Sequence, residues 1–178
     1  MATPRQPGLE AVFTDRGDDD EIPYIKVRSQ RNADGTDVHV WEKWVAFNVD
    51  PLYLALFARY DPGMIVRHHG HHSPHTLLVL GGSIRCGDVD LGPGDHVELP
   101  LGASFGPFEA GPDGAELSEV MMGDPRSWSD DEDSMVALLA ARGAERLPDP
   151  PIDLPGGLED LRQVYARAEA LAAEADAD

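Results

Sequence analysis

Five of the chain's seven histidines are clustered in residues 68–75. In an extended strand, successive side chains point to opposite faces, so His69 and His71 share one face. Ser73-Pro74 interrupts this strand, and His75 opens the apolar run that follows. Two imidazoles at positions i and i+2, with a third on the returning strand, can converge on one point. Because neutral imidazole suits Fe, Ni, Cu or Zn better than Mg or Ca, the cluster has the outline of a transition-metal site.

The glycines around these histidines extend the pattern. From Gly63 to Gly82 the spacing is Gly-x5-His-x-His-x3-His-x6-Gly. This resembles the first sequence motif of the cupin superfamily, with His75 where the family usually has Glu. Residues 94–105 resemble the second motif, Gly-x5-Pro-x-Gly-x2-His, and Phe105 stands where the family has its remaining metal ligand.

The resemblance implies an all-β fold, the cupin-type double-stranded β-helix or jelly-roll barrel. It also implies that His69, His71 and His75 bind a divalent transition metal, with Fe²⁺ favoured and Ni²⁺, Zn²⁺ or Mn²⁺ as alternatives. Three-histidine iron sites occur among cupin dioxygenases that cleave diketones or oxidise thiols, which makes that chemistry a candidate. In those enzymes the third histidine comes from the second motif. We expect Phe105, which replaces it here, to form a wall of the cavity that holds the cofactor.

Arg67 is a candidate for binding the substrate. If the histidine strand is unbroken, Arg67 points to the same side as His69 and His71. A guanidinium beside a metal can bind a substrate carboxylate with two parallel hydrogen bonds. The alternative is that Arg67 lies at the barrel mouth and pairs with one of the chain's many acidic residues.

Glu119 is the second catalytic candidate, and it depends on the phase of the last barrel strand. If Leu117 and Met121 face inward, Glu119 lies between them inside the barrel. There it could be a fourth metal ligand, or a general acid or base with a raised pKa. The opposite phase, with Val120 and Met122 buried, is equally consistent with the sequence.

Short segments rich in aromatic and β-branched residues, separated by Gly/Pro turns, predict an all-β sandwich or barrel. The predicted strands are residues 24–27 (short), 38–49, 54–60, the histidine strand, 77–80, 83–86, 89–91, 96–99, 104–109 and 116–122. Turns are expected at residues 32–35, 61–63, 92–95 and 111–114.

We divide the chain into three parts that form a single structural domain. Residues 1–36 are polar and are expected to form an irregular N-terminal arm. Residues 37–127 form the barrel. Residues 128–178 form a C-terminal helical extension, with one helix at 134–141, where Ser134 is the expected cap, and an apolar stripe that predicts another at 158–172.

Composition limits the possible partners. The net charge of −19 argues against nucleic acid and against anionic membrane surfaces. Nothing resembles a transmembrane span or a signal sequence. Cys86 is the only cysteine, so no intramolecular disulfide can form and a reducing, cytoplasmic location is expected. We expect Cys86 to be a packed core thiol, and the partner to be a small molecule.

Aromatic residues on the early strands suggest an interface. Trp41 and Trp44 differ in parity, so at least one should point away from the barrel interior, and Phe47 lies close by. Exposed tryptophan is unusual unless something covers it, and aromatic residues are enriched in interfaces. We expect a homodimer through these strands, with the helix at 158–172 as the alternative cover.

Two functions from different classes follow. The first is a small non-haem metalloenzyme, an oxidoreductase of the dioxygenase type that acts on a small anionic or enolisable substrate. The alternative is a cupin that binds a ligand or senses a metal without turnover. The histidines outside the site, His39, His68, His72 and His96, are expected at the surface or behind the ligands.

Overall fold

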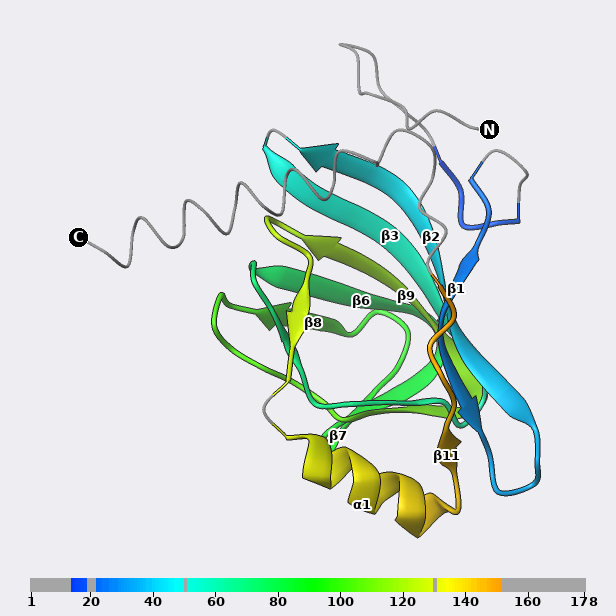
Figure 1. Cartoon of the computed structure of the whole chain (residues 1–178). Helices are drawn as coiled ribbons and strands as arrows, with labels where there is room; N and C mark the ends of the chain where they lie inside the picture. The colour runs from blue at the N-terminus through cyan, green and yellow to red at the C-terminus, as the bar shows by residue number, and fades with distance from the viewer. Residues whose placement is uncertain (1–13, 19–21, 50, 130, 152–178) are drawn as a thin grey trace.

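The structure is a computed structural model, and it describes residues 14–18, 22–49, 51–129 and 131–151. These residues form many strands and one helix (Figure 1). The elements are β1 (Ile25–Arg31), β2 (Asp37–Val49), β3 (Leu52–Tyr60), β4 (Ile65–Val66), β5 (Gly70–His71), β6 (His75–Cys86), β7 (Val89–Leu91), β8 (His96–Leu99), β9 (Phe108–Met121), β10 (Ser127–Trp128), α1 (Glu132–Arg142) and β11 (Glu145–Arg146). The prediction of an all-β fold is confirmed.

A nine-stranded antiparallel sheet makes up most of the fold. Its central order is β11-β1-β2-β3-β9-β6-β7, while β4 pairs with β9 and β8 pairs with β6. Strands β5 and β10 form a separate two-stranded sheet. Figure 1 shows the large sheet bending along its length, with α1 beneath its lower end. No helix in the described part of the chain is long and apolar enough to cross a membrane.

Alternation along the paired strands builds the core. On β3, Leu54, Leu56 and Ala58 are buried, while the residues between them are more exposed. On β9, Leu117 and Met121 continue the same apolar layer. Since side chains on a strand alternate with a period of two, each strand contributes one apolar row to the interior.

The turn predicted at residues 111–114 is wrong, because β9 runs through it from Phe108 to Met121. The segment lies opposite a register shift in β6, where Gly82 faces Ala115 and Ile84 faces Ala110. Residues 111–114 therefore form a bulge. Pro112, which has no N–H to donate, is tolerated at such a position without ending the strand.

The two strands predicted at residues 77–80 and 83–86 are one strand, β6. The break that we expected between them is a bend. Gly82 has a φ of 66°, and a Cβ there would overlap the carbonyl oxygen of Gly114. Glycine adopts this left-handed conformation at little cost, which lets β6 bend without losing its partner strands.

The first strand, β1, and the start of the helix α1 differ from the prediction. The short strand expected at residues 24–27 is the longer β1, which pairs with both β2 and β11. The cap of α1 is Asp131, whose carboxylate accepts a hydrogen bond from the Ser134 backbone N–H at 3.0 Å. Ser134 lies inside the helix and is not its cap. The helix predicted at residues 158–172 lies outside the described residues.

Trp41 and Trp44 point to opposite faces of β2, as their parity predicts. Trp41 lies below the Lys26 ammonium, 5.0 Å from the ring centroid, and its Nε1 donates to Asp61 at 3.3 Å. Trp44 packs against the apolar core. Both side chains are partly buried within one chain. The homodimer stays a prediction.

Replacing Gly82 by alanine should destabilise the fold by about 2 kcal/mol or more, because the new Cβ meets backbone at a positive φ. Gly92→Ala is the matched control, since a Cβ there meets nothing within 4 Å. Urea unfolding monitored by tryptophan fluorescence measures both. Equal unfolding midpoints for the two variants would show that the bend at Gly82 is not a constraint.

Candidate functional site

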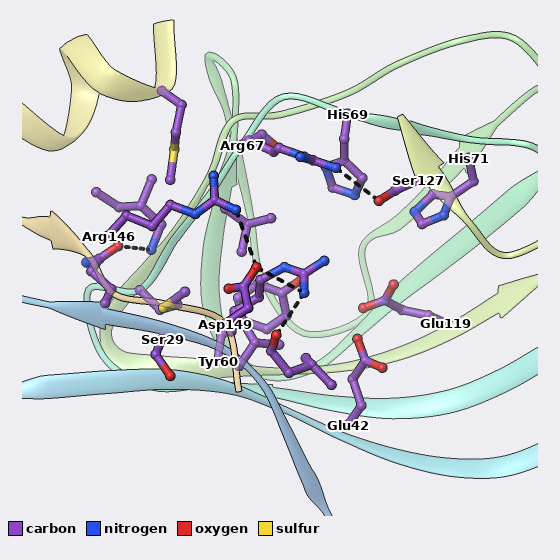
Figure 2. Close-up of a pocket in the computed structure, with 18 of the residues that line it drawn as sticks. Ser29, Glu42, Tyr60, Arg67, His69, His71, Glu119, Ser127, Arg146 and Asp149 are labelled. Atoms are coloured by element: carbon purple, nitrogen blue, oxygen red, sulfur yellow. Dashed lines mark hydrogen bonds and ion pairs between the residues drawn. The ribbon is translucent and has the colours of Figure 1, made fainter. Parts of the chain in front are cut away.

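A cavity of about 100 Å³ lies between the large sheet and the β5–β10 sheet. Figure 2 shows its polar side chains gathered at two ends. The histidine end carries His69, His71, Glu42 and Glu119. The arginine end carries Arg28, Arg146 and Asp149. Apolar side chains also line the cavity, among them Val40, Val66, Met121 and Met135.

His69 and His71 are held by the backbone on both sides of the cavity. His69 exchanges two backbone hydrogen bonds with Phe105, at 3.0 and 2.9 Å, and His71 lies on β5 opposite Ser127 of β10. Each imidazole Nδ1 lies 2.8 Å from a carbonyl oxygen, that of Arg67 for His69 and that of Pro125 for His71.

A carbonyl oxygen can only accept a hydrogen bond, so Nδ1 must be the protonated nitrogen in both rings. The lone pair is then on Nε2 of His69 and of His71. Metal-binding histidines are commonly oriented in this way by a second hydrogen bond.

His75 and Glu119 meet inside the barrel as a diagonal pair. His75 lies opposite Met121 in the β6–β9 register, and Glu119 lies opposite Leu77. Diagonal neighbours on one face of a sheet are within reach of long side chains. His75 Nε2 lies 3.0 Å from Glu119 Oε2, and the His75 side chain is 1% exposed.

The contact between His75 and Glu119 is close but poorly aligned. Neither ring nitrogen of His75 makes a hydrogen bond with the described residues. A buried polar atom without a partner is rare and costly, and a bound ion or ligand is one of its explanations. The ring centroids of His71 and His75 are 4.6 Å apart, and those of His69 and His71 are 5.1 Å apart.

Burial favours the neutral forms of His69 and His71. It lowers the pKa of His69 to about 4, and it lowers the pKa of His71, to which the neighbouring His75 also contributes. Burial by itself would raise the pKa of Glu119, but the interaction with His75 and the other histidines lowers it. The expected inward phase of Glu119 is confirmed by its burial. The expected raised pKa is wrong, because the His75 ring, 3.0 Å from Oε2, leads the interactions that lower the pKa of Glu119 and outweigh the effect of burial.

The donor set fits a transition ion in its chemistry. Two imidazoles have a free Nε2, a third has unpartnered nitrogens, and a carboxylate lies beside it. Within the described ranges, however, no group of three or more His, Cys, Asp or Glu side chains is arranged as a closed metal-binding cluster. Side-chain rotation would have to bring the donors together.

The structure places Arg67 and Phe105 on different sides of the histidines. Arg67 lines the cavity and donates to Glu132 at 3.1 Å and to Ser127 at 3.2 Å. The Phe105 ring is part of the apolar core and lies 5.1 Å from the His69 ring and 5.4 Å from the His75 ring. The described residues that line the cavity do not include it.

Several cavity residues were not predicted from the sequence. Glu42 lies on β2 and Tyr60 on β3, both facing inward. No sequence motif distinguishes these two positions from the other positions of the same strands. Arg146 and Asp149 lie in the C-terminal extension, between the two helices predicted there. For Glu42 a signal existed, since its parity matches that of Trp44, which packs inward.

The remaining histidines and Cys86 lie where expected or close to it. His72 and His96 are exposed, and His68 is partly buried. The His39 Nδ1 atom lies 3.1 Å from the Oγ of Ser29, a residue that lines the cavity, but His39 itself is not among the lining residues. Cys86 is partly buried against the apolar core, and this burial raises the pKa of its thiol.

The low pKa of His69 predicts a specific loss of stability in acid. In the unfolded chain His69 takes up a proton near pH 6.5, but in the folded chain only near pH 4. Between these values the unfolded state binds more protons, so the free energy of unfolding falls as the pH falls. His69 can contribute up to roughly 1.4 kcal/mol per pH unit.

Urea unfolding at pH 7, 6 and 5 measures this effect. His69→Asn should flatten the dependence on pH, whereas His96→Asn, at an exposed position, should leave it unchanged. An identical slope in the wild type and in His69→Asn would show that His69 is not held neutral by burial.

Comparison with known proteins shows the fold. No family model matches the chain, and no curated protein matches it. Among solved structures, the chain is similar to a protein proposed to be an acetylacetone dioxygenase from Methylibium petroleiphilum PM1. The identity is 11% over 75% of this chain and 97% of that chain, and the TM-score is 0.50.

Two further solved structures are similar at lower scores. One is the polyketide cyclase RemF from Streptomyces resistomycificus, with 16% identity over 85% of this chain and 94% of that chain, and a TM-score of 0.45. The other is an RmlC-like cupin from Shewanella frigidimarina NCIMB 400, with 20% identity over 49% and 77% and a TM-score of 0.41. Together with the curved antiparallel sheet, the likeness at a TM-score of 0.50 shows that this chain has a cupin-like fold.

Proposed function

We propose that His69, His71 and His75 bind one divalent transition ion, and that the protein is a small non-haem metalloenzyme acting on an anionic or enolisable substrate. One observation carries the proposal. Two buried imidazoles are oriented by backbone carbonyls so that Nε2 is free, next to a third imidazole without hydrogen-bond partners. Such groups are stabilised when an ion completes their interactions.

An all-imidazole set suits Fe²⁺, Ni²⁺ and Zn²⁺. The resemblance to the cupin motifs favours Fe²⁺ among them, and Mn²⁺ is a further alternative. When bound, the ion supplies Lewis-acid or redox chemistry at the histidine end. Neutral imidazoles do not offset its charge. Glu119 has a lowered pKa and lies 3.0 Å from His75 Nε2, so it contributes the balancing negative charge.

The charge of the arginines around the cavity supports an anionic substrate. Three guanidinium groups share two carboxylates in a chain of ion pairs, in the order Arg67, Glu132, Arg146, Asp149 and Arg28. One positive charge is therefore left over beside a cavity in a protein with a net charge of −19. Guanidinium groups bind carboxylates and enolates with paired hydrogen bonds.

Within this site the two predicted catalytic residues have separate roles. Arg67 orients the substrate, since its guanidinium lines the cavity close to His69 (Figure 2). Glu119 is ionised at neutral pH and accepts a proton from the substrate, since its lowered pKa makes it a carboxylate across that range.

The second candidate is a protein that binds a ligand or senses a metal without turnover. Phe105 favours it, because an aromatic ring replaces the ligand that the cupin motif would have there. The two candidates share the metal and differ only in turnover.

The metal content of the isolated protein tests the shared part. We expect close to one transition ion per chain by elemental analysis, and at least a tenfold loss in the His69→Ala/His71→Ala variant, because two of three ligands are removed. His96→Ala is the control. If the double variant keeps the wild-type metal content, these histidines are not the ligands.

Dioxygen uptake distinguishes turnover from binding. The iron-loaded protein should consume dioxygen with at least one member of a panel of acetylacetone, small thiols and aromatic diols. Arg67→Leu should raise KM about tenfold or more while kcat changes less, because it removes substrate binding. Saturable binding of a panel member without dioxygen uptake would favour the second candidate.

A further inference from the structure

Glu42 is a carboxyl group inside the cavity that the proposed function does not use. It lies on β2 opposite Ala58, whose side chain faces the interior. Glu42 therefore shares the inward face, and Figure 2 shows its carboxyl group at the histidine end, beside Glu119.

Only one of the two oxygens of the Glu42 carboxyl group has a hydrogen-bond partner. Trp44 Nε1 donates a hydrogen bond to Oε2 at 2.6 Å. The other oxygen, Oε1, makes no hydrogen bond or ion pair within the described residues. Because Trp44 is fixed by the apolar core, this contact orients Glu42 and leaves Oε1 available to the cavity.

Its surroundings disfavour the charged form. Burial raises the pKa of Glu42 to about 7, and the charge of Glu119 adds to this effect, whereas Trp44 and the guanidinium of Arg28 act in the opposite direction. Tyr60, the other titratable group facing Glu42, has its pKa raised by burial and by both glutamates, so it stays neutral. At neutral pH Glu42 is thus divided between its two forms.

This charge balance decides which ligands can enter. The arginine chain leaves one positive charge over, and the ionised Glu119 already balances it. If Glu42 is ionised as well, an anion meets two carboxylates at the histidine end and a net negative charge. With Glu42 protonated, these charges sum to zero and Oε1–H becomes a hydrogen-bond donor.

We propose that an anionic ligand enters this cavity together with a proton, and that Glu42 carries the proton. The proton passes from solvent to Oε1 of Glu42, and no bond of the ligand breaks. The neutral acid then donates to an oxygen of the ligand, while the arginines balance its charge. The apolar side chains that line the cavity specify the class as a small carboxylate or enolate with a short hydrocarbon body.

The proposal deepens the anionic substrate of the proposed function, and it predicts a direction of pH dependence. If only the protonated form of Glu42 admits the anion, affinity is full below the pKa and falls as the pH rises above it. Between pH 6 and pH 8 this is about a tenfold loss of affinity.

The test uses the full chain as isolated, with isobutyrate as the probe and ligand-observed NMR at pH 6, 7 and 8. The wild type should bind about tenfold more tightly at pH 6 than at pH 8. Glu42→Gln, which imitates the neutral acid, should bind with the same affinity at all three values. Glu98→Gln removes an exposed carboxyl group on β8 and should behave as the wild type.

Trp44→Phe is the second variant, and it keeps the test independent of how Glu42→Gln folds. The indole donor lowers the pKa of Glu42, so its loss should raise this pKa and move the midpoint of the pH dependence upward. Equal wild-type affinity at pH 6 and 8, or an unchanged pH dependence in Glu42→Gln, overturns the proposal. So does absence of isobutyrate binding at every pH, while the metal content of the same sample decides the proposed metal site separately.

Discussion

The site depends on one constraint, which is that polar side chains in the inward rows of the sheet must remain neutral or be paired. His75 and Glu119 occupy positions on β6 and β9 whose neighbours, such as Leu77 and Leu117, are core residues. Moving charge into such a place is expensive unless a partner compensates it. The close approach of His75 and Glu119, and the neutral state of His69, are both responses to this constraint.

The same constraint applies to the ionisable side chains on both faces of β2. Glu42 points into the cavity, where burial favours its neutral form. Its neighbour Lys43 points the other way and is fully buried beneath the N-terminal segment, with its ammonium donating to the Gly17 carbonyl at 2.6 Å. A lysine can be buried when its donors have acceptors. Gly17 of the described segment 14–18 is therefore part of the cover over this face of β2.

The arginine end comes from chain that folds back after the barrel. The α1 helix brings Met135 to the cavity wall, and β11 pairs with the edge of β1, which places Arg146 and Asp149 beside Arg28. The barrel strands provide the histidines and glutamates. The returning segment provides one arginine, Arg146, and the two carboxylates of the ion-pair chain, Glu132 and Asp149.

The sequence by itself determined the all-β class and the shared face of His69 and His71, because a period of two and a few glycines specify both locally. Tertiary structure alone decided the phase of Glu119, since both phases satisfy the alternation and only packing against β3 and β6 distinguishes them. It also decided that residues 111–114 continue a strand, because a bulge needs a partner whose register shifts. The ionisation of Glu42 and Glu119 was beyond sequence reasoning, since a pKa depends on burial and neighbouring charges that only the folded chain brings together.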